Sequence, residues 1–208
     1  MNVDRIYRYN SWRIYAVAIG AALLTGALCG VIYPYFEEWV YSLPLLLALL
    51  PPLLLAYLLG KPAGLLLATV ARRVQYFDAE TLVMAALLAG LLILPAIRLT
   101  QYCLVLHPQA LAQATLLRAT EPTWSDGARL LTSWQTAMQA HPFHEFLVGK
   151  ITAFPDAIDP NGILLSHTTF GWLFWFLRLV LCCVSCLGIP LALLTSLRAG
   201  EEHPHSAG

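Results

Sequence analysis

The chain has 208 residues, of which 59% are hydrophobic and only 12% are charged, and its twelve basic residues balance its twelve acidic residues. A soluble domain has about 25% charged residues, so this composition would expose large apolar patches to water and excludes an ordinary soluble protein. The balanced charge also gives no indication of nucleic acid as a partner.

Four apolar runs are long enough to cross a bilayer, and they lie near residues 14–33, 39–59, 81–100 and 171–194. A transmembrane helix needs about 20 mostly apolar residues, because the hydrocarbon layer is about 30 Å thick and a helix rises about 1.5 Å per residue. The sequence therefore predicts an all-α integral membrane bundle of about four transmembrane helices, with a partly helical external segment between spans three and four.

The first run follows Arg5, Arg8 and Arg13, as the apolar core of a secretory signal does. It is longer than the core of about 7–15 residues that such signals have, so we expect a retained anchor, with cleavage as the alternative. Small residues recur at every fourth position of this run, at Ala18, Ala22, Gly26 and Gly30. They would stack into a groove for close helix packing, either within the bundle, which we favour, or along a dimer seam.

The second run is too long for one crossing, since Lys61 is the only charge between Trp39 and Ala71. The segment 60–64 has turn composition, so we expect the span to end near Leu59 and residues 63–71 to lie as a short helix at the membrane surface. The adjacent prolines Pro51 and Pro52 predict a kink within the span.

Three amphipathic patterns follow in the segment 107–167. The first should begin at Pro108, the second should be capped by Ser125 and bury Leu130, Leu131, Trp134 and Met138, and the third should bury Phe146, Leu147, Ile151 and Phe154 and end at Pro155. About 60 residues provide too little core for an independent domain, so these helices should rest on the bundle or on the lipid headgroups.

Basic residues favour one side of the predicted bundle. Arg5, Arg8, Arg13, Lys61, Arg72, Arg73 and Arg198 flank the runs on that side, whereas acidic residues outnumber basic ones in the segment 107–167. The positive-inside rule therefore predicts that both termini are cytoplasmic. The chain divides into residues 1–106 with three spans, an extracytoplasmic segment 107–167, and residues 168–208 with the final span and a cytoplasmic tail.

Two clusters could carry chemistry, and both have a simpler interpretation. His141, His144 and Glu145 are possible zinc or iron ligands, but their spacing matches no metalloenzyme motif and Pro142 interrupts the helix that such motifs need, so we expect no metal. Cys182, Cys183 and Cys186 resemble a redox pair only in spacing. Their apolar surroundings disfavour a thiolate, so we expect them to pack as small apolar side chains.

Arg178 is the one charge well inside an apolar run. A charged residue at the centre of a transmembrane helix costs about 3 kcal/mol on insertion scales and is by default a candidate functional residue. In the predicted topology it shares the outer half of the membrane with Glu37, Glu38 and Arg98. We expect an ion-paired cluster that orders the bundle, in which Arg178 pairs with Glu37 or Glu38, with a binding pocket for an anionic group as the alternative.

Two boundaries resemble those of uncharacterised bacterial multi-pass membrane proteins. They are the Val31-Ile-Tyr-Pro-Tyr and Trp39-Val-Tyr-Ser-Leu stretches between the first two spans, and the Asn161-Gly-Ile and Phe170-Gly-Trp-Leu-Phe-Trp stretches before the last. The similarity lies in the order of the elements. It implies a multi-pass protein of the bacterial inner membrane and assigns no role to any residue.

We therefore expect a non-catalytic membrane protein without a cofactor, an accessory, scaffold or assembly component that contacts the bilayer and other membrane proteins or a second copy of itself. A small oligomeric transporter or channel is the alternative. A metal-dependent membrane enzyme that uses His141, His144 and Glu145 is the third possibility.

Overall fold

The computed structural model describes residues 3–74, 78–120, 123–158 and 167–202, and contains no strand within these ranges. The six helices are α1 (Val3–Tyr41), α2 (Leu45–Val74), α3 (Ala79–Thr120), α4 (Asp126–Ala140), α5 (Phe143–Ile158) and α6 (His167–Glu202). Four of them contain segments long and apolar enough to cross a membrane: Trp12–Tyr41, Leu47–Arg73, Ala79–Thr120 and Thr168–Ser196. The predicted all-α bundle with four candidate membrane spans is confirmed.

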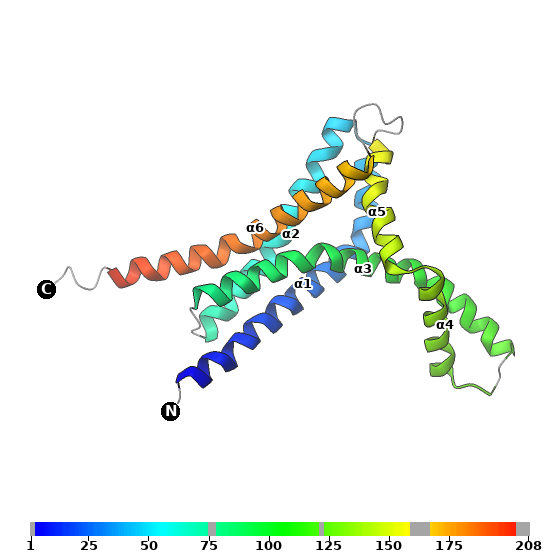
Figure 1. Cartoon of the computed structure of the whole chain (residues 1–208), viewed down its shortest axis with the longest axis horizontal. Coiled ribbons are helices and arrows are strands. Elements are labelled where there is room, and N and C mark those ends of the chain that lie inside the picture. Colours follow the sequence, from blue (N-terminus) through cyan, green and yellow to red (C-terminus); the bar gives the residue numbers. More distant parts are fainter. Residues whose placement is uncertain (1–2, 75–77, 121–122, 159–166, 203–208) are drawn as a thin grey trace.

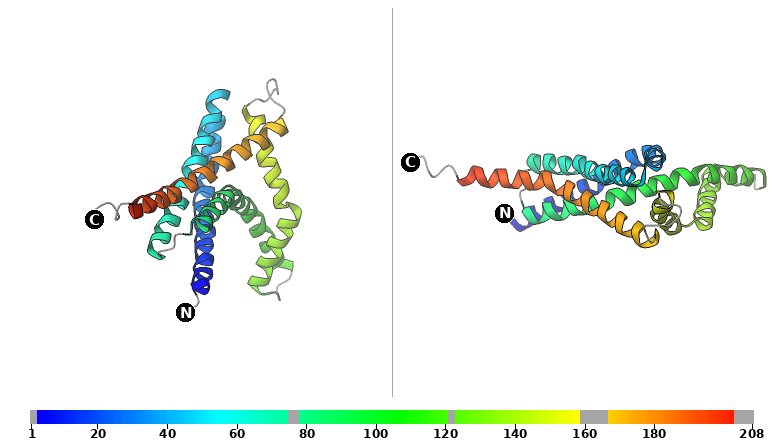
Figure 2. Two further views of the ribbon diagram at one scale, coloured as in Figure 1. Left: turned by 60° about the vertical axis from the view of Figure 1, so that its left-hand side comes forward. Right: turned by 90° about the horizontal axis from the view of Figure 1, so that it is seen from above.

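The four long helices form the bundle, and α4 and α5 lie at one end of it (Figure 1). α1 packs mainly on α3, and α2 packs mainly on α6. The start of α1 and the end of α6 lie at the same end of the molecule, as an even number of spans requires, whereas α4 and the last part of α3 project from the opposite end (Figures 1 and 2).

The groove of small residues on α1 faces α3 of the same chain. Ala18 and Ala22 are fully buried. A Cβ atom added to Gly26 would lie 2.3 Å from Ala96 Cβ, and one added to Gly30 would lie 2.6 Å from Thr100 Cβ. The backbones of α1 and α3 can approach each other closely because these four positions of α1 carry no side chain or only a methyl group.

The second span does not end near Leu59, because α2 continues as one helix through residues 60–64 to Val74. The predicted turn and the separate surface helix at residues 63–71 are therefore wrong. Packing explains the difference: a Cβ atom on Gly60 would lie 2.5 Å from Cys182 O, so this glycine lets α2 press against the backbone of α6. The contact between Gly60 and α6 therefore outweighs the local preference of residues 60–64 for a turn.

The third span and the first external helix are likewise one helix, since α3 runs through Pro108 to Thr120. The prediction that Pro108 begins a helix is wrong. The N-cap of α4 is confirmed, because Ser125 Oγ accepts a hydrogen bond from Ala128 N at 3.3 Å. The third pattern forms α5, which continues past Pro155 to Ile158 rather than ending at the proline.

The face that α4 buries differs from the predicted one. Leu130, Leu131 and Met138 are exposed, and Trp134 is half-buried, whereas Arg129, Ser133 and Ala137 are buried. The small side chains of Ser133 and Ala137 let α4 lie close to α3, which turns the bulky leucines outward. On α5 the expected stripe is confirmed at Phe146 and Leu147, which are half-buried, and at Ile151, which is buried, while the side chain of Phe154 lies outside the described residues.

Candidate functional site

Four helices bring polar side chains to one place near the end of the bundle that α5 covers. On three of them the contributing residues are three or four positions apart and so share one face of the helix. They are Tyr33 and Glu37 from α1, Arg98 and Gln101 from α3, and Trp175 and Arg178 from α6, and α5 adds Lys150. We call this set, with the cavity that it surrounds, the basic pocket.

The position of Lys150 depends on close contact between α5 and the first turns of α6. A Cβ atom added to Gly171 would lie 2.5 Å from Ile151 O, so the glycine leaves room for the α5 backbone. Ile151 is buried, and the preceding residue, Lys150, reaches the pocket with a side chain that stays 39% exposed. α5 therefore covers the pocket and supplies a partly hydrated cation to it.

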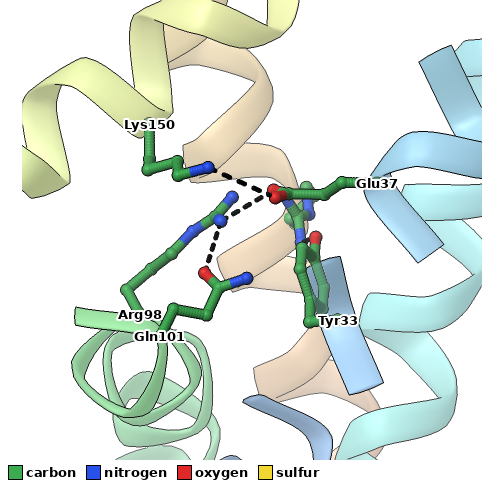
Figure 3. Close-up of polar contacts among 6 residues, drawn as sticks. Tyr33, Glu37, Arg98, Gln101 and Lys150 are labelled. Carbon is green, nitrogen blue, oxygen red and sulfur yellow. Dashed lines mark hydrogen bonds and ion pairs between the residues drawn. The ribbon is translucent and has the colours of Figure 1, made fainter. Parts of the chain in front are cut away.

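Glu37 binds two of the three cations (Figure 3). Arg98 Nη1 donates to Glu37 Oε1 at 2.7 Å and also to Gln101 Oε1 at 2.7 Å. Lys150 Nζ lies 3.8 Å from Glu37 Oε2. Arg98 and Glu37 are both at least nine-tenths buried, so theirs is a buried ion pair completed by a neutral amide.

Arg178 is not part of that ion pair, and the prediction that it pairs with Glu37 or Glu38 is wrong. Its Nη2 donates to the Tyr33 hydroxyl oxygen, Glu37 is occupied by Arg98, and Glu38 is exposed. Consecutive residues of a helix point in different directions, so only one of the two glutamates faces the core. The Nε atom of Arg178 is buried and has no hydrogen-bond partner among the residues that the structure describes.

Two aromatic rings hold both guanidinium groups. The Cζ atoms of Arg98 and Arg178 lie 5.0 and 5.5 Å from the ring centroid of Tyr33, and 5.9 and 5.8 Å from that of Trp175. Contacts of this kind contribute about 0.5–2 kcal/mol each, most where water is excluded. The rings therefore stabilise two like charges that share a small volume, but they do not neutralise them.

The described residues that line the pocket carry three cations, Arg98, Arg178 and Lys150, and one anion, Glu37, so the sum is +3 − 1 = +2. The cavity between them measures about 20 Å³. That is room for about one or two water molecules. Sites that bind an oxyanion combine buried positive charge with hydrogen-bond donors that have no other partner, and this pocket has both.

The other candidates from the sequence do not join this site. His144 Nε2 lies 4.0 Å from Glu145 Oε1, and both side chains are mostly exposed. His141 lies at the C-terminal cap of α4, where its carbonyl accepts a hydrogen bond from Tyr102. Within the described ranges no three His, Cys, Asp or Glu side chains are grouped so that they could hold a metal ion.

The three clustered cysteines pack between helices. Cys182, Cys183 and Cys186 are buried and free, and Cys186 Sγ donates to Gly60 O at 3.2 Å. They occupy the interface between α6 and its neighbours α2 and α3 as small side chains.

Tyr33, Gln101, Lys150 and Trp175 belong to the pocket and were not identified from the sequence. Three of them lie three or four residues from Glu37, Arg98 or Arg178, so helical spacing from the known charges could have found them. Lys150 had a different signal, since it is a base next to the apolar stripe of α5.

No family model matches the chain, and no curated protein or solved structure is significantly similar to it.

Proposed function

We propose that this protein is a non-catalytic membrane protein that binds an anionic group in the basic pocket. The observation that carries the proposal is Arg178, a residue that is 5% exposed. Its guanidinium has a tyrosine hydroxyl rather than a carboxylate as its polar partner, and its Nε has no partner among the described residues. An anion at this position would supply both the missing charge and the missing acceptor.

A purely structural role for the cluster fits these observations less well. Buried charges in membrane helices are usually paired with one another or belong to a functional site. Here Glu37, the only acid among the described lining residues, already contacts Arg98 and Lys150. A buried cation without a compensating charge lowers stability, so its presence in the bundle favours a ligand that balances the charge of Arg178.

The lining also favours binding over catalysis. The charged groups of the described lining are mainly guanidinium and ammonium donors, and its one carboxylate, that of Glu37, contacts two cations. The proposed setting remains the bacterial inner membrane, with both termini cytoplasmic. An accessory or assembly component could use such a pocket to recognise an anionic partner, whereas a transporter would need the anion to pass through.

The test is a thermal-unfolding titration of detergent-solubilised protein with inorganic phosphate, glycerol 3-phosphate and phosphatidate in mixed micelles, with sodium chloride at matched ionic strength. A ligand that binds only the folded state raises the unfolding temperature. At least one of the three should do so in the native protein and in Arg73→Gln, an exposed arginine at the end of α2, and not in Arg178→Gln. Equal shifts in all three proteins, or no shift with any probe, would overturn the proposal.

A further inference from the structure

An apolar groove lies beside the basic pocket, and the two together match an amphiphile. On the basis of the proposed function, we propose that the bound anion is the phosphate of an anionic phospholipid, phosphatidate above others, whose acyl chain lies in this groove. The groove measures about 690 Å³. That is within the range of about 300–1,000 Å³ of small-molecule sites. It is lined by Phe36 and Trp39 of α1, by residues 50–51, 53–55 and 57–58 of α2, and by Leu181 of α6.

The groove and the pocket are adjacent. Phe36 lines both of them, and the neighbouring prolines divide between them, with Pro52 in the pocket and Pro51 in the groove. On α6 the pocket residue Arg178 and the groove residue Leu181 are three positions apart, which is about 4.5 Å along a helix. One ligand can therefore reach both.

The direction of the groove fits a lipid in its leaflet. α2 starts at Leu45, so Pro52 lies seven residues from that end and Leu58 lies thirteen. Leu58 is therefore about 9 Å farther along the helix axis than Pro52. α6 runs in the same sense, with Leu181 farther than Arg178 from its first residue. From the level of the pocket the groove extends along Leu53–Leu58 toward the middle of the spans, as an acyl chain extends from its headgroup toward the bilayer centre, while Trp39 and Leu50 line the end of the groove nearer the helix termini.

The groove is open on the outside of the bundle. Leu50, Leu54 and Leu58, three of its lining side chains, are exposed on the surface of a candidate membrane span. Among the described residues of the lining, only the hydroxyl of Tyr57 and the indole N–H of Trp39 can form side-chain hydrogen bonds. The occupant of such a surface inside a bilayer is a hydrocarbon chain, and it can enter sideways from the membrane.

Charge favours phosphatidate over other phospholipids. Its phosphomonoester carries about −1.5 to −2 charges near neutral pH, as other phosphomonoesters do. That value balances the +2 of the pocket. A phosphodiester headgroup carries a single negative charge, and phosphatidylcholine is neutral as a whole. Because the cavity has room for only about one or two waters, a phosphate oxygen rather than the whole headgroup would enter between Arg98 and Arg178.

Native mass spectrometry of the purified protein tests this directly, with phosphatidate, phosphatidylglycerol and phosphatidylcholine of identical acyl chains. We expect retention in that order. Arg178→Gln should lower the affinity for phosphatidate about tenfold, equivalent to about 1.4 kcal/mol, and Arg73→Gln should leave it unchanged. Leu54→Trp, which fills the groove, should weaken retention of the lipid, whereas Leu91→Trp, at an exposed leucine of α3 outside the groove, should not.

Fluorescence locates the acyl chain independently. Phosphatidate brominated at the headgroup end of its acyl chains should quench the emission of Trp39, which lines the groove near the pocket, measured as the difference between the native protein and Trp39→Phe. If glycerol 3-phosphate binds with the same dependence on Arg178 as phosphatidate and with equal affinity, and Trp39 is not quenched, the lipid inference is overturned while the anion-binding function stands. If neither binds in a manner that depends on Arg178, both proposals fail.

Discussion

Replacing Glu37 with glutamine should be the most destabilising single change in the basic pocket, because Glu37 is the only acid among its described lining residues. Glutamine can still accept a hydrogen bond from Arg98 but cannot balance its charge. Removing one partner of a buried ion pair costs about 3–5 kcal/mol. Since Lys150 is half-exposed and can turn toward water, we expect the lower end of that range, about 3 kcal/mol.

A second substitution shows whether the cost arises from excess positive charge. Arg178→Met loses the hydrogen bond to Tyr33 and two ring contacts. Both rings also contact Arg98, so we take the lower end of the usual ranges, which sums to about 2.5 kcal/mol. It also removes a buried cation whose insertion costs about 3 kcal/mol. These effects nearly cancel, so Arg178→Met alone should change the free energy of unfolding by no more than about 1 kcal/mol.

In the double variant the two changes should not add. In Glu37→Gln the pocket holds three cations without an acid. Adding Arg178→Met reduces them to two, so the double variant should recover at least about 1 kcal/mol of the stability that Glu37→Gln loses. The assay is reversible unfolding in mixed micelles of a neutral detergent, followed by circular dichroism for the four proteins of the cycle. Strict additivity, or a cost of about 3 kcal/mol or more for Arg178→Met alone, would refute this account of the pocket.

Three further outcomes are expected. Gly26→Leu should destabilise the bundle by about 1–3 kcal/mol or more through overpacking. Gly20→Leu should not, because a Cβ atom at Gly20 meets no atom within 4 Å. Equal unfolding free energies for both variants would contradict the packing of α1 on α3. Lys150→Gln should change stability by less than about 1 kcal/mol, because the pair is long and half-exposed, yet weaken binding of phosphate in the titration; unchanged binding would remove Lys150 from the site. Reporter fusions at Ser206 and near Asp126 should report cytoplasmic and external locations respectively, and a cytoplasmic signal near Asp126 would overturn the topology.

The membrane spans could be predicted because their signal is averaged over about 20 residues and depends on hydrophobicity alone. The helix ends expected near Leu59 and at Pro108 could not be predicted, unlike the N-cap at Ser125, because the same local sequence serves two purposes. Gly60 and Pro62 suit a turn, yet in the structure they lie within α2, and Gly60 faces the backbone of α6. Pro108 suits the start of a helix, yet it lies within α3. In each case contacts with a distant segment decide whether the helix continues.

The pocket was only partly predictable for a similar reason. A charge within an apolar run drew attention to Arg178, and the predicted topology grouped it with Glu37 and Arg98. Which of the two arginines receives the carboxylate depends on how α1, α3 and α6 are rotated about their axes, and periodicity within one helix does not determine that. The apolar stripe of α4 illustrates the same limit, since Leu131 is exposed although the amphipathic pattern predicted it to be buried.

The most direct test compares the unfolding free energies of the native protein and Arg178→Met without any anionic ligand and then with phosphatidate in the micelles. Without ligand the two values should agree to within about 1 kcal/mol. With phosphatidate at about ten times its dissociation constant, the native protein should gain about 1.4 kcal/mol and the variant should gain little. An equal gain in both proteins would contradict the claim that Arg178 binds an anion in this pocket.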